Sequence, residues 1–222
     1  FTDPEIAAVG GPAVTPDSDS LMQKASGGVY CSYLMSGQYF YRYLPKKERF
    51  VDDYPSCNFL VRKSVMLALD GFNTKFWPGE DTFLCLKIVR DLKKKIIYDP
   101  RVLVYHHRRC LFKGHLKQIA NYALHRGYFV KRFPQTSCKF TYFIPSIFLA
   151  GLFIGGALSY LFPVFKLTYI LAVIFYFTLV FISSISKDFL LILPVFWGII
   201  FSHLVYGLYF IKGLFSRKLK EE

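Results

Sequence analysis

Charged residues are almost absent from residues 142–215 of this 222-residue chain, although the whole chain carries a net charge of +13. The surface of such an apolar stretch has to be buried in protein or lipid. The sequence therefore excludes a protein made only of water-exposed globular domains. The region upstream, about 140 residues, is long enough to form a core of its own. From Tyr142 to Phe215 the charged residues are only Lys166, Lys187, Asp188 and Lys212.

Closely spaced cysteines are also lacking. The number of cysteines is odd and none belongs to a Cys-x-x-Cys pair, which argues against a zinc site and favours reduced thiols in a cytosolic domain. The five are Cys31, Cys57, Cys85, Cys110 and Cys138.

Positive charge is concentrated in the middle of the chain. Residues 1–90 contain ten Lys/Arg and ten Asp/Glu, whereas residues 91–139 contain twelve basic residues against only Asp91 and Asp99. A basic block directly before an apolar region is typical of a cytosolic membrane face with anionic lipids, and it also suits phosphate-bearing substrates. No nucleic-acid-binding module accompanies the charge, so we expect no nucleic-acid partner.

Hydrophobic periodicity and turn residues predict an α/β order in the upstream region. An apolar run before Gly10-Gly11-Pro12 predicts a strand that ends in a turn, and Asp17-Ser18-Asp19-Ser20 offers N-caps for a helix at about 21–33. Further strands are expected before residue 63 and at 95–98 and 102–105. Further helices are expected from residue 63, at 80–92 and at 111–133, the last being basic and amphipathic and therefore suited to a membrane interface.

Three apolar spans follow, at about 142–165, 167–185 and 189–211, and each is about long enough to cross a bilayer as a helix. The basic block predicts that Lys139 is cytosolic. Three full crossings would then place Arg217-Lys218-Leu219-Lys220 outside, against the tendency of positive charge to stay inside. The sequence leaves three alternatives: a re-entrant span, an interfacial span, or an orientation dominated by the upstream charge.

Two adjacent carboxylates, Glu80 and Asp81, follow a Pro-Gly turn in the stretch Phe76-Trp77-Pro78-Gly79. A carboxylate at a helix start is stabilised as an anion by the helix dipole and the free backbone N–H groups, so capping explains both residues. A rigid, ionised carboxylate also suits a general base that accepts the proton of an attacking hydroxyl. Both interpretations stay open on these residues alone.

A second polar group, His106-His107-Arg108-Arg109, follows the strand expected at 102–105. Neighbours in an extended segment point to opposite faces, so only one histidine can share a site with Asp81. Imidazole is a good ligand for a divalent metal and an arginine can clamp a diphosphate, although a solvated strand end explains the same residues. One face of the last amphipathic helix has residues four apart that could bind phosphate or sugar: Gln118, Tyr122 and Arg126.

These motifs form an ordered series along the chain: the turn at 10–12, Asn58 to Arg62, Gly71-Phe72, Gly79-Glu80-Asp81, Tyr98-Asp99-Pro100, Val104 to Arg109, and Arg126-Gly127. The series resembles the second half of family 2 glycosyltransferases, which are inverting enzymes of the GT-A fold. It is most similar to bacterial membrane-anchored members that build cell-surface polysaccharides and glycolipids. The resemblance covers nearly all of residues 1–139, and the apolar region fits only in kind.

The resemblance implies an α/β fold: the C-terminal part of a GT-A, Rossmann-like domain followed by about three transmembrane helices. Residues 1–110 would form the acceptor-side half of the catalytic domain and 111–139 amphipathic interfacial helices. Residues 140–215 would be the transmembrane helices and 216–222 a charged tail. The implied location is the bacterial inner membrane, with several crossings and a cytosolic catalytic domain.

The resemblance also implies partners and residue roles. The partners would be a nucleotide-sugar donor, a lipid-linked or saccharide acceptor, and the membrane. A divalent metal, Mg²⁺ or Mn²⁺, would assist. Asp81 would be the catalytic base. The other roles are acceptor binding by Glu80, Trp77 and Asn58, metal binding by His106, and diphosphate binding by Arg109 and Arg126.

The chain departs from the family in two places. The Gln-x-x-Arg-Trp element of processive synthases is absent, which favours transfer of one sugar or a few. The nucleotide-binding half with its Asp-x-Asp motif is also missing, and Asp17-Ser18-Asp19, which has the letters, follows the turn and is predicted to be a capping loop. We therefore expect a C-terminal fragment of a longer protein that does not bind donor well by itself.

Two rival hypotheses come from other functional classes. The chain could be a non-catalytic membrane subunit or scaffold that keeps the glycosyltransferase fold and pairs with an active partner. It could also be a transporter component, but His203 is the only ionisable residue well inside the spans, and intramembrane function usually needs more.

Overall fold

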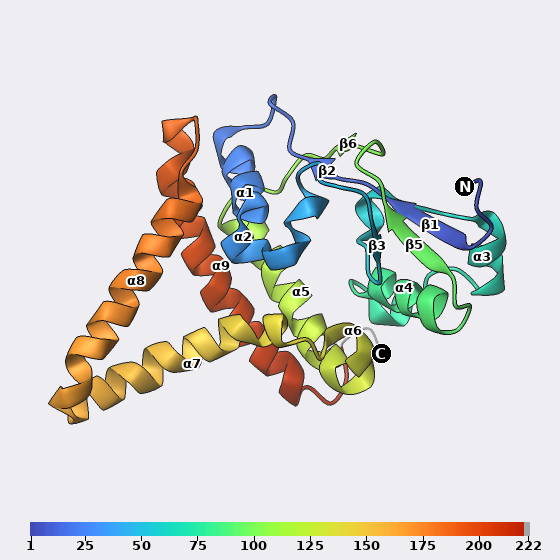
Figure 1. Cartoon of the computed structure of the whole chain (residues 1–222). Coiled ribbons are helices and arrows are strands. Elements are labelled where there is room, and N and C mark those ends of the chain that lie inside the picture. The colour runs from blue at the N-terminus through green and yellow to red at the C-terminus, as the bar shows by residue number, and fades with distance from the viewer. Residues whose placement is uncertain (220–222) are drawn as a thin grey trace.

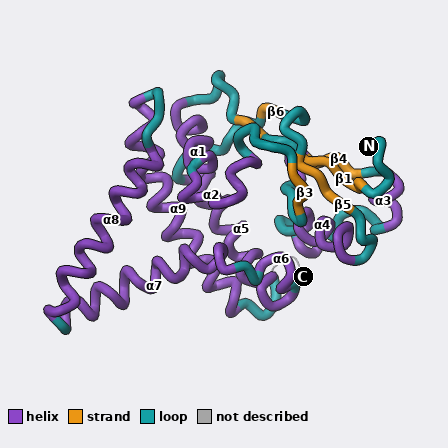
Figure 2. Tube along the Cα trace, viewed as in Figure 1, coloured by secondary structure: helices purple, strands orange, loops and turns teal. Residues whose placement is uncertain are grey.

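In the computed structural model, which describes residues 1–219, the strands gather at one end and three long apolar helices at the other (Figures 1 and 2). The mixed α/β order and the three apolar helices predicted from the sequence are therefore confirmed. Membership of the GT-A, Rossmann-like class stays a prediction. Of the predicted charged tail, residues 220–222 lie outside the described residues.

The larger sheet has four strands in the order β3-β5-β1-β4. β1 (Ile6–Gly10) pairs in parallel with β5 (Lys95–Tyr98), and both edge strands, β3 (Arg49–Val51) and β4 (Phe59–Val61), are antiparallel to their neighbours. A smaller parallel sheet joins β2 (Ala13–Val14) to β6 (Val104–Tyr105). The predicted strands are present, although β6 is shorter than expected.

The core of this end lies between the larger sheet and two helices, α3 (Lys63–Ala68) and α4 (Glu80–Arg90). Ala8 and Ile96 from the sheet pack in one cluster with Val65 of α3 and Leu84 of α4. The apolar spacing of α4 predicted this buried face, and Asp91 and Leu92 of the predicted helix fall just beyond its end.

The opposite face of the sheet carries an apolar row. Phe50, Ile97, Val9 and Leu60 are register partners across the four strands, and cross-strand partners point to the same face. Phe50 is 65% exposed and Leu60 is 48% exposed. The two ends of the row are thus left uncovered by the described residues.

Shorter helices connect the strands to the long helices. α1 (Leu21–Cys31) begins after Ser20, whose N–H is bonded to the side chain of Gln23 at 3.1 Å, so one of the four predicted caps is used. α2 (Tyr33–Ser36) and α6 (Pro134–Ser137) are single turns. Four 3₁₀ turns complete the list: η1 (Gly37–Arg42), η2 (Ser56–Asn58), η3 (Thr74–Phe76) and η4 (Pro163–Phe165).

The four long helices are α5 (Lys113–Arg132), α7 (Phe140–Leu161), α8 (Lys166–Ser184) and α9 (Phe189–Phe215). α5 and α9 run side by side, whereas α7 and α8 extend away and meet at η4 (Figure 1). In its most apolar stretch 39% of α9 is buried within the protein, compared with 6% for each of the other two apolar spans. α9 therefore belongs to a core shared with α1 and α5. The sequence did not predict this, because it assigned all of residues 140–215 to transmembrane helices.

α5 and α9 approach each other closely at two glycines, one on each helix. A Cβ atom on Gly127 would overlap the carbonyl oxygen of Phe210 and lie 3.0 Å from the Cα atom of Gly213. A Cβ atom on Gly213 would likewise overlap the carbonyl oxygen of Leu124. The two backbones can approach this closely only because neither position carries a side chain.

We expect Gly127→Ala to lower the free energy of unfolding by about 1–3 kcal/mol, because the added methyl group must push α5 away from α9. Gly151→Ala is the matched control, since it also places alanine in a long helix and no atom lies within 4 Å of its Cβ position. Thermal unfolding in detergent measures both variants. Equal stability of the two would contradict the close packing.

Candidate functional site

Asp81 lies in the first turn of α4, beside the loop that precedes β4. Its Oδ2 accepts the N–H of Ser56 at 3.2 Å and its Oδ1 accepts the N–H of Thr82 at 2.7 Å. These bonds and the helix start favour the anion, as the sequence suggested. Burial outweighs them and, together with the negative charges of Asp53 and Glu80, raises the pKa of Asp81 to about 6.

Asp53 is the second carboxylate of the site and is buried. It forms ion pairs with Arg126 of α5 and with Arg42, whose Nη2 is 3.6 Å from Oδ2, and its Oδ1 accepts the hydroxyl of Thr82 at 3.0 Å. Burial alone would raise the pKa of Asp53, but the two arginines outweigh it and lower the pKa to about 2. Asp53 is therefore ionised at neutral pH, and its charge makes Asp81 hold a proton more tightly.

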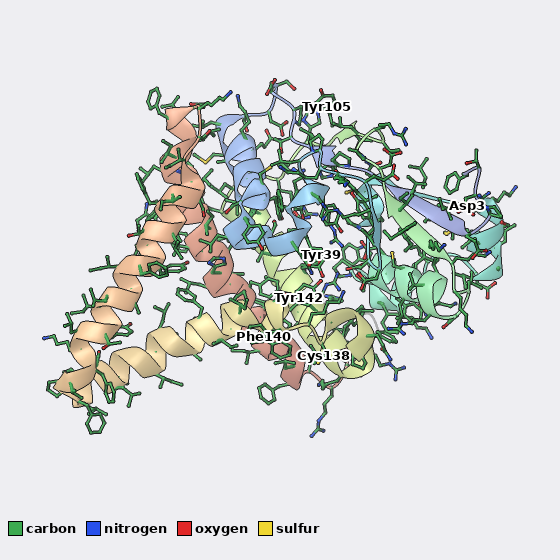
Figure 3. The ribbon with its side chains drawn as sticks, in the orientation of Figure 1. Asp3, Tyr39, Tyr105, Cys138, Phe140 and Tyr142 are labelled. Carbon is green, nitrogen blue, oxygen red and sulfur yellow. The ribbon has the colours of Figure 1, made fainter. Side chains whose placement is uncertain are left out.

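Two tyrosines cover the arginines that neutralise Asp53. The guanidinium of Arg42 is 4.6 Å from the ring centroid of Tyr39, and that of Arg126 is 5.1 Å from the ring centroid of Tyr142. The two rings stack with centroids 5.9 Å apart and lie next to each other in Figure 3. Cation–π contacts of this kind hold charged groups in place inside a protein, so the first turn of α7 helps to build the site.

Arg108 is buried on the other side of the site. Its Nε donates to the hydroxyl of Thr15 at 3.1 Å, and its Nη2 donates to the carbonyl oxygen of Ala13. The guanidinium is 5.2 Å from the ring centroid of Tyr43 and 5.6 Å from that of Tyr30. Strand β2 and two aromatic rings thus fix this positive charge.

Asp19 fastens the segment that carries Arg108. Its Oδ2 accepts the N–H of Arg108 at 3.1 Å, and its Oδ1 is bonded to Nδ1 of His107. The carboxylate of Asp19 is 1% exposed, whereas the ring of His107 is 72% exposed. Burial raises the pKa of Asp19, but the hydrogen bonds from His107 and Arg108 outweigh it, so the pKa is lowered. The loop predicted to cap a helix therefore also positions the His-Arg segment, and no local spacing signals a contact 88 residues away.

Cys57 belongs to η2 and directly follows Ser56. Burial raises the pKa of its thiol, while Arg108 lowers it and Asp81 raises it further. The charge at the acidic start of α4 and the charge of the basic segment after β6 therefore both act on this one thiol. That Asp81 and the basic segment share one site stays a prediction from the order of motifs, which did not identify Cys57.

Of the three predicted acceptor-binding residues, Glu80 is next to Asp81 and Trp77 precedes Asp81 by four residues in the chain. Glu80 precedes it in α4, and its buried Oε2 has no hydrogen-bond partner among the described residues. Trp77 is 55% exposed and is held through its carbonyl oxygen, which is 3.0 Å from Nε2 of His125 on α5. Their contact with an acceptor stays a prediction.

Asn58, the third predicted acceptor-binding residue, is used inside the protein. Its Nδ2 donates to the carbonyl oxygens of Gly11 and Val102, both at 2.7 Å. These bonds tie the turn at 10–12 to the segment before β6. The geometry gives the amide nitrogen of Asn58 a structural role and does not support the predicted contact with an acceptor.

The two arginines predicted to bind a diphosphate differ in their surroundings. Arg109 is exposed, and within the described residues its guanidinium forms no hydrogen bond or ion pair. Arg126 is 3% exposed, and its Nη2 binds Asp53, Thr82 at 3.0 Å and Tyr122 at 2.7 Å. A direct contact between Arg126 and a diphosphate would break the ion pair with Asp53. The geometry therefore gives Arg126 a positioning role beside Asp81 instead.

His106, the predicted metal ligand, points its Nδ1 at Nη1 of Arg108, 3.2 Å away. Arginine only donates, so Nδ1 is the acceptor and the other ring nitrogen carries the proton. Burial and then the charge of Arg108 lower the pKa of His106, which stays neutral. Neither ring nitrogen offers a free lone pair, so His106 does not fit the role of metal ligand in this arrangement.

No group of three or more His, Cys, Asp or Glu side chains that could hold a metal ion occurs among the described residues. The divalent cation therefore stays a prediction from the sequence resemblance. Comparison with known protein families, curated proteins and solved structures finds no match for this chain. The resemblance to glycosyltransferases accordingly rests on the ordered motifs alone.

We expect Asp81→Asn to raise the free energy of unfolding at pH 7.5. The pKa of Asp81 in the folded protein lies above its ordinary value of 3.8, so ionisation costs stability, and the cost appears as pH rises from about 4 to above 6. The gain should reach up to about 3 kcal/mol at pH 7.5 and vanish near pH 4. Urea unfolding in detergent at both pH values measures it.

Asp91→Asn is the matched control, since Asp91 is an exposed carboxylate at the opposite end of the same helix. It should change stability little at either pH. A gain for Asp81→Asn that is the same at pH 4 and pH 7.5 would contradict the raised pKa.

Proposed function

We propose that the protein is a membrane-associated inverting glycosyltransferase that moves a sugar from a nucleotide-sugar donor to a lipid-linked or glycan acceptor. The proposed setting is cell-surface polysaccharide or glycolipid synthesis at the cytosolic face of the bacterial inner membrane. The observation that carries the proposal is the raised pKa of Asp81 at the start of α4, in the motif that resembles the catalytic element of family 2 enzymes.

Asp81 acts as the general base in this proposal. Its carboxylate takes the proton of the acceptor hydroxyl while the hydroxyl oxygen bonds to the anomeric carbon of the donor. The bond from that carbon to the diphosphate breaks on the opposite side, and the leaving diphosphate takes the electron pair, which inverts the anomeric centre. A carboxylate with a pKa near 6 is a stronger base than an ordinary aspartate and is still mostly ionised at neutral pH.

The ion pair between Asp53 and Arg126 supports this role. Asp53 cannot take the proton itself, because two arginines hold its pKa at about 2. Its negative charge raises the pKa of the neighbouring Asp81 instead. Two carboxylates whose pKa values are pushed apart by their surroundings are typical of a site in which one carboxylate transfers the proton.

The basic segment after β6 suits the leaving group. Arg109 is exposed, and the buried charge of Arg108 acts on the same thiol, that of Cys57, as the charge of Asp81. Positive charge here would stabilise the negative charge that grows on the diphosphate. A bound divalent cation would add to this effect.

The uncovered apolar row on the sheet also supports the proposal. Exposed apolar patches of this kind mark surfaces that contact another protein segment. The row from Phe50 to Leu60 gives the predicted nucleotide-binding half a surface against which to pack.

Asp81→Asn in the full-length protein is expected to lower sugar transfer by at least about 100-fold, because the acceptor hydroxyl loses its base. Nucleotide-sugar binding should be nearly unchanged, since the base faces the acceptor. Transfer is measured with a panel of radiolabelled nucleotide sugars and native membrane lipid, and binding by calorimetry. Asp91→Asn is the control and should keep wild-type transfer. Full transfer by Asp81→Asn would sink the role of Asp81, and a wild-type protein without any transfer would favour the non-catalytic subunit.

The rate of transfer should rise with pH through an acid limb centred near pH 6, where Asp81 loses its proton. Glu80→Gln should move this limb to lower pH, because the charge of Glu80 helps to raise the pKa of Asp81. The profile of kcat/KM between pH 4.5 and 8.5 measures both effects. A limb that stays in place in Glu80→Gln would show that another group controls it.

A further inference from the structure

We propose that only α7 and α8 cross the membrane, as a hairpin, while α9 lies along the membrane surface beneath α1 and α5. The ends of the membrane region, at Cys138 and at Lys218, then stay on one side of the bilayer. This inference concerns the surface that meets lipid and does not depend on the proposed enzymatic activity.

α9 is paired with α5. α5 runs parallel to α9 over the whole of its own length, with Phe112 against Phe201 at its start and Nζ of Lys131 bonded to the carbonyl oxygen of Ser216 at its end. Between these points the buried ring of His115 is bonded to the hydroxyl of Ser202 at 2.9 Å. Any membrane depth occupied by residues 201–216 of α9 is therefore shared by α5.

α5 cannot lie in the hydrocarbon layer. It exposes charged and polar side chains near both of its ends: Lys113, Lys117, Gln118, Lys131 and Arg132. Such side chains are expensive inside a bilayer and are rare there. The part of α9 without this partner, from Phe189 to Ile200, is about 18 Å long, whereas the hydrocarbon core is about 30 Å thick.

α9 has apolar residues on both faces, with the exposed Lys212 near its end, because its two faces meet two apolar environments. One face packs against protein and includes Ile199, Tyr206 and Phe210. The other face is exposed, and its residues recur at helical spacing: Leu190, Leu193, Trp197, Phe201, Leu208 and Phe215. A helix sandwiched between a protein core and a lipid surface has the same composition as a spanning helix.

α7 and α8 have the opposite properties. They are almost unburied, and each is about 29–33 Å long, which matches the hydrocarbon core. The start of α7 and the end of α8, which we call the two feet of the hairpin, contact α9 at different places. Ser146 near the start of α7 donates to the carbonyl oxygen of Gly207 at 3.0 Å, whereas Val180 near the end of α8 packs with Val195. The far ends meet at η4, away from the sheet and from α5 (Figure 1).

The basic residues around the hairpin are also divided between its two ends. Lys139 and Lys187 stand at the two feet of the hairpin, on the side of the basic α5. The turn between α7 and α8 has Lys166 alone, beside the 78% exposed Val164. With both feet on one side, Arg217 and Lys218 also stay on the side of the basic block. The conflict between three full crossings and the retention of positive charge on one side then disappears.

Cysteine labelling tests this topology, because Cys138 is a native exposed reporter two residues before α7 (Figure 3). The background is the full chain with Cys57→Ser and Cys110→Ser, which removes the other exposed thiols. Adding Cys138→Ser allows single reporters at Val164→Cys and Lys218→Cys. A membrane-impermeant maleimide is applied to intact spheroplasts and to inverted membrane vesicles.

We expect the thiols at positions 138 and 218 to react in the same one of the two preparations, and the thiol at position 164 to react only in the other. Reaction of positions 138 and 218 in opposite preparations would mean three crossings and would overturn the proposal. A thiol at position 164 that reacts with Cys138, or in neither preparation, would also overturn it. If a reporter variant fails to reach the membrane, Tyr160→Cys and Arg217→Cys replace it, since both positions are exposed as well.

Discussion

The backbone contact between α5 and α9 fixes the position of the candidate site. Two neighbouring residues of α5 do different work: Arg126 reaches the carboxylate of Asp53, and Gly127 lies against the backbone of α9. Successive residues on a helix point about 100° apart, so seating Gly127 on α9 sets the direction in which Arg126 points. The arginine that controls the charges of the site is therefore held by an apolar helix.

The electrostatic consequence runs through Asp53 to Asp81. A buried ion pair is costly to form and is retained where its geometry matters, because removing one partner leaves an unpaired charge in the interior. Here two arginines keep Asp53 ionised, and the ionised Asp53 raises the pKa of Asp81. A shift of α5 along α9 would change this arrangement without touching Asp81 itself. The pKa of Asp81 thus depends, through Arg126 and Asp53, on the packing of Gly127 against α9.

The sequence predicted the local elements well and the long-range partners poorly. Strands β1 and β5 and helix α4 follow from apolar periodicity and turn residues, which act over a few neighbours. The partners of Arg126, Asn58 and Asp19 lie 73, 47 and 88 residues away, and no spacing rule reaches so far. The predicted roles of Arg126 and Asn58 failed to find support for this reason: both residues are polar and lie in suggestive motifs, but their side chains are used within the fold.

α9 shows a different limit of sequence reasoning. Its composition satisfies every criterion for a transmembrane helix, because burial in protein and contact with lipid both select apolar residues. Only the helix packed against α9 distinguishes a buried helix from a spanning one. That helix is α5, which begins 76 residues before α9 begins. In the proposed arrangement, a surface helix beside the candidate site would hold Asp81 at a fixed height above the lipid headgroups. The proposed acceptor, anchored in the bilayer, would then search only a plane, which would raise its effective concentration at Asp81 without any new contact.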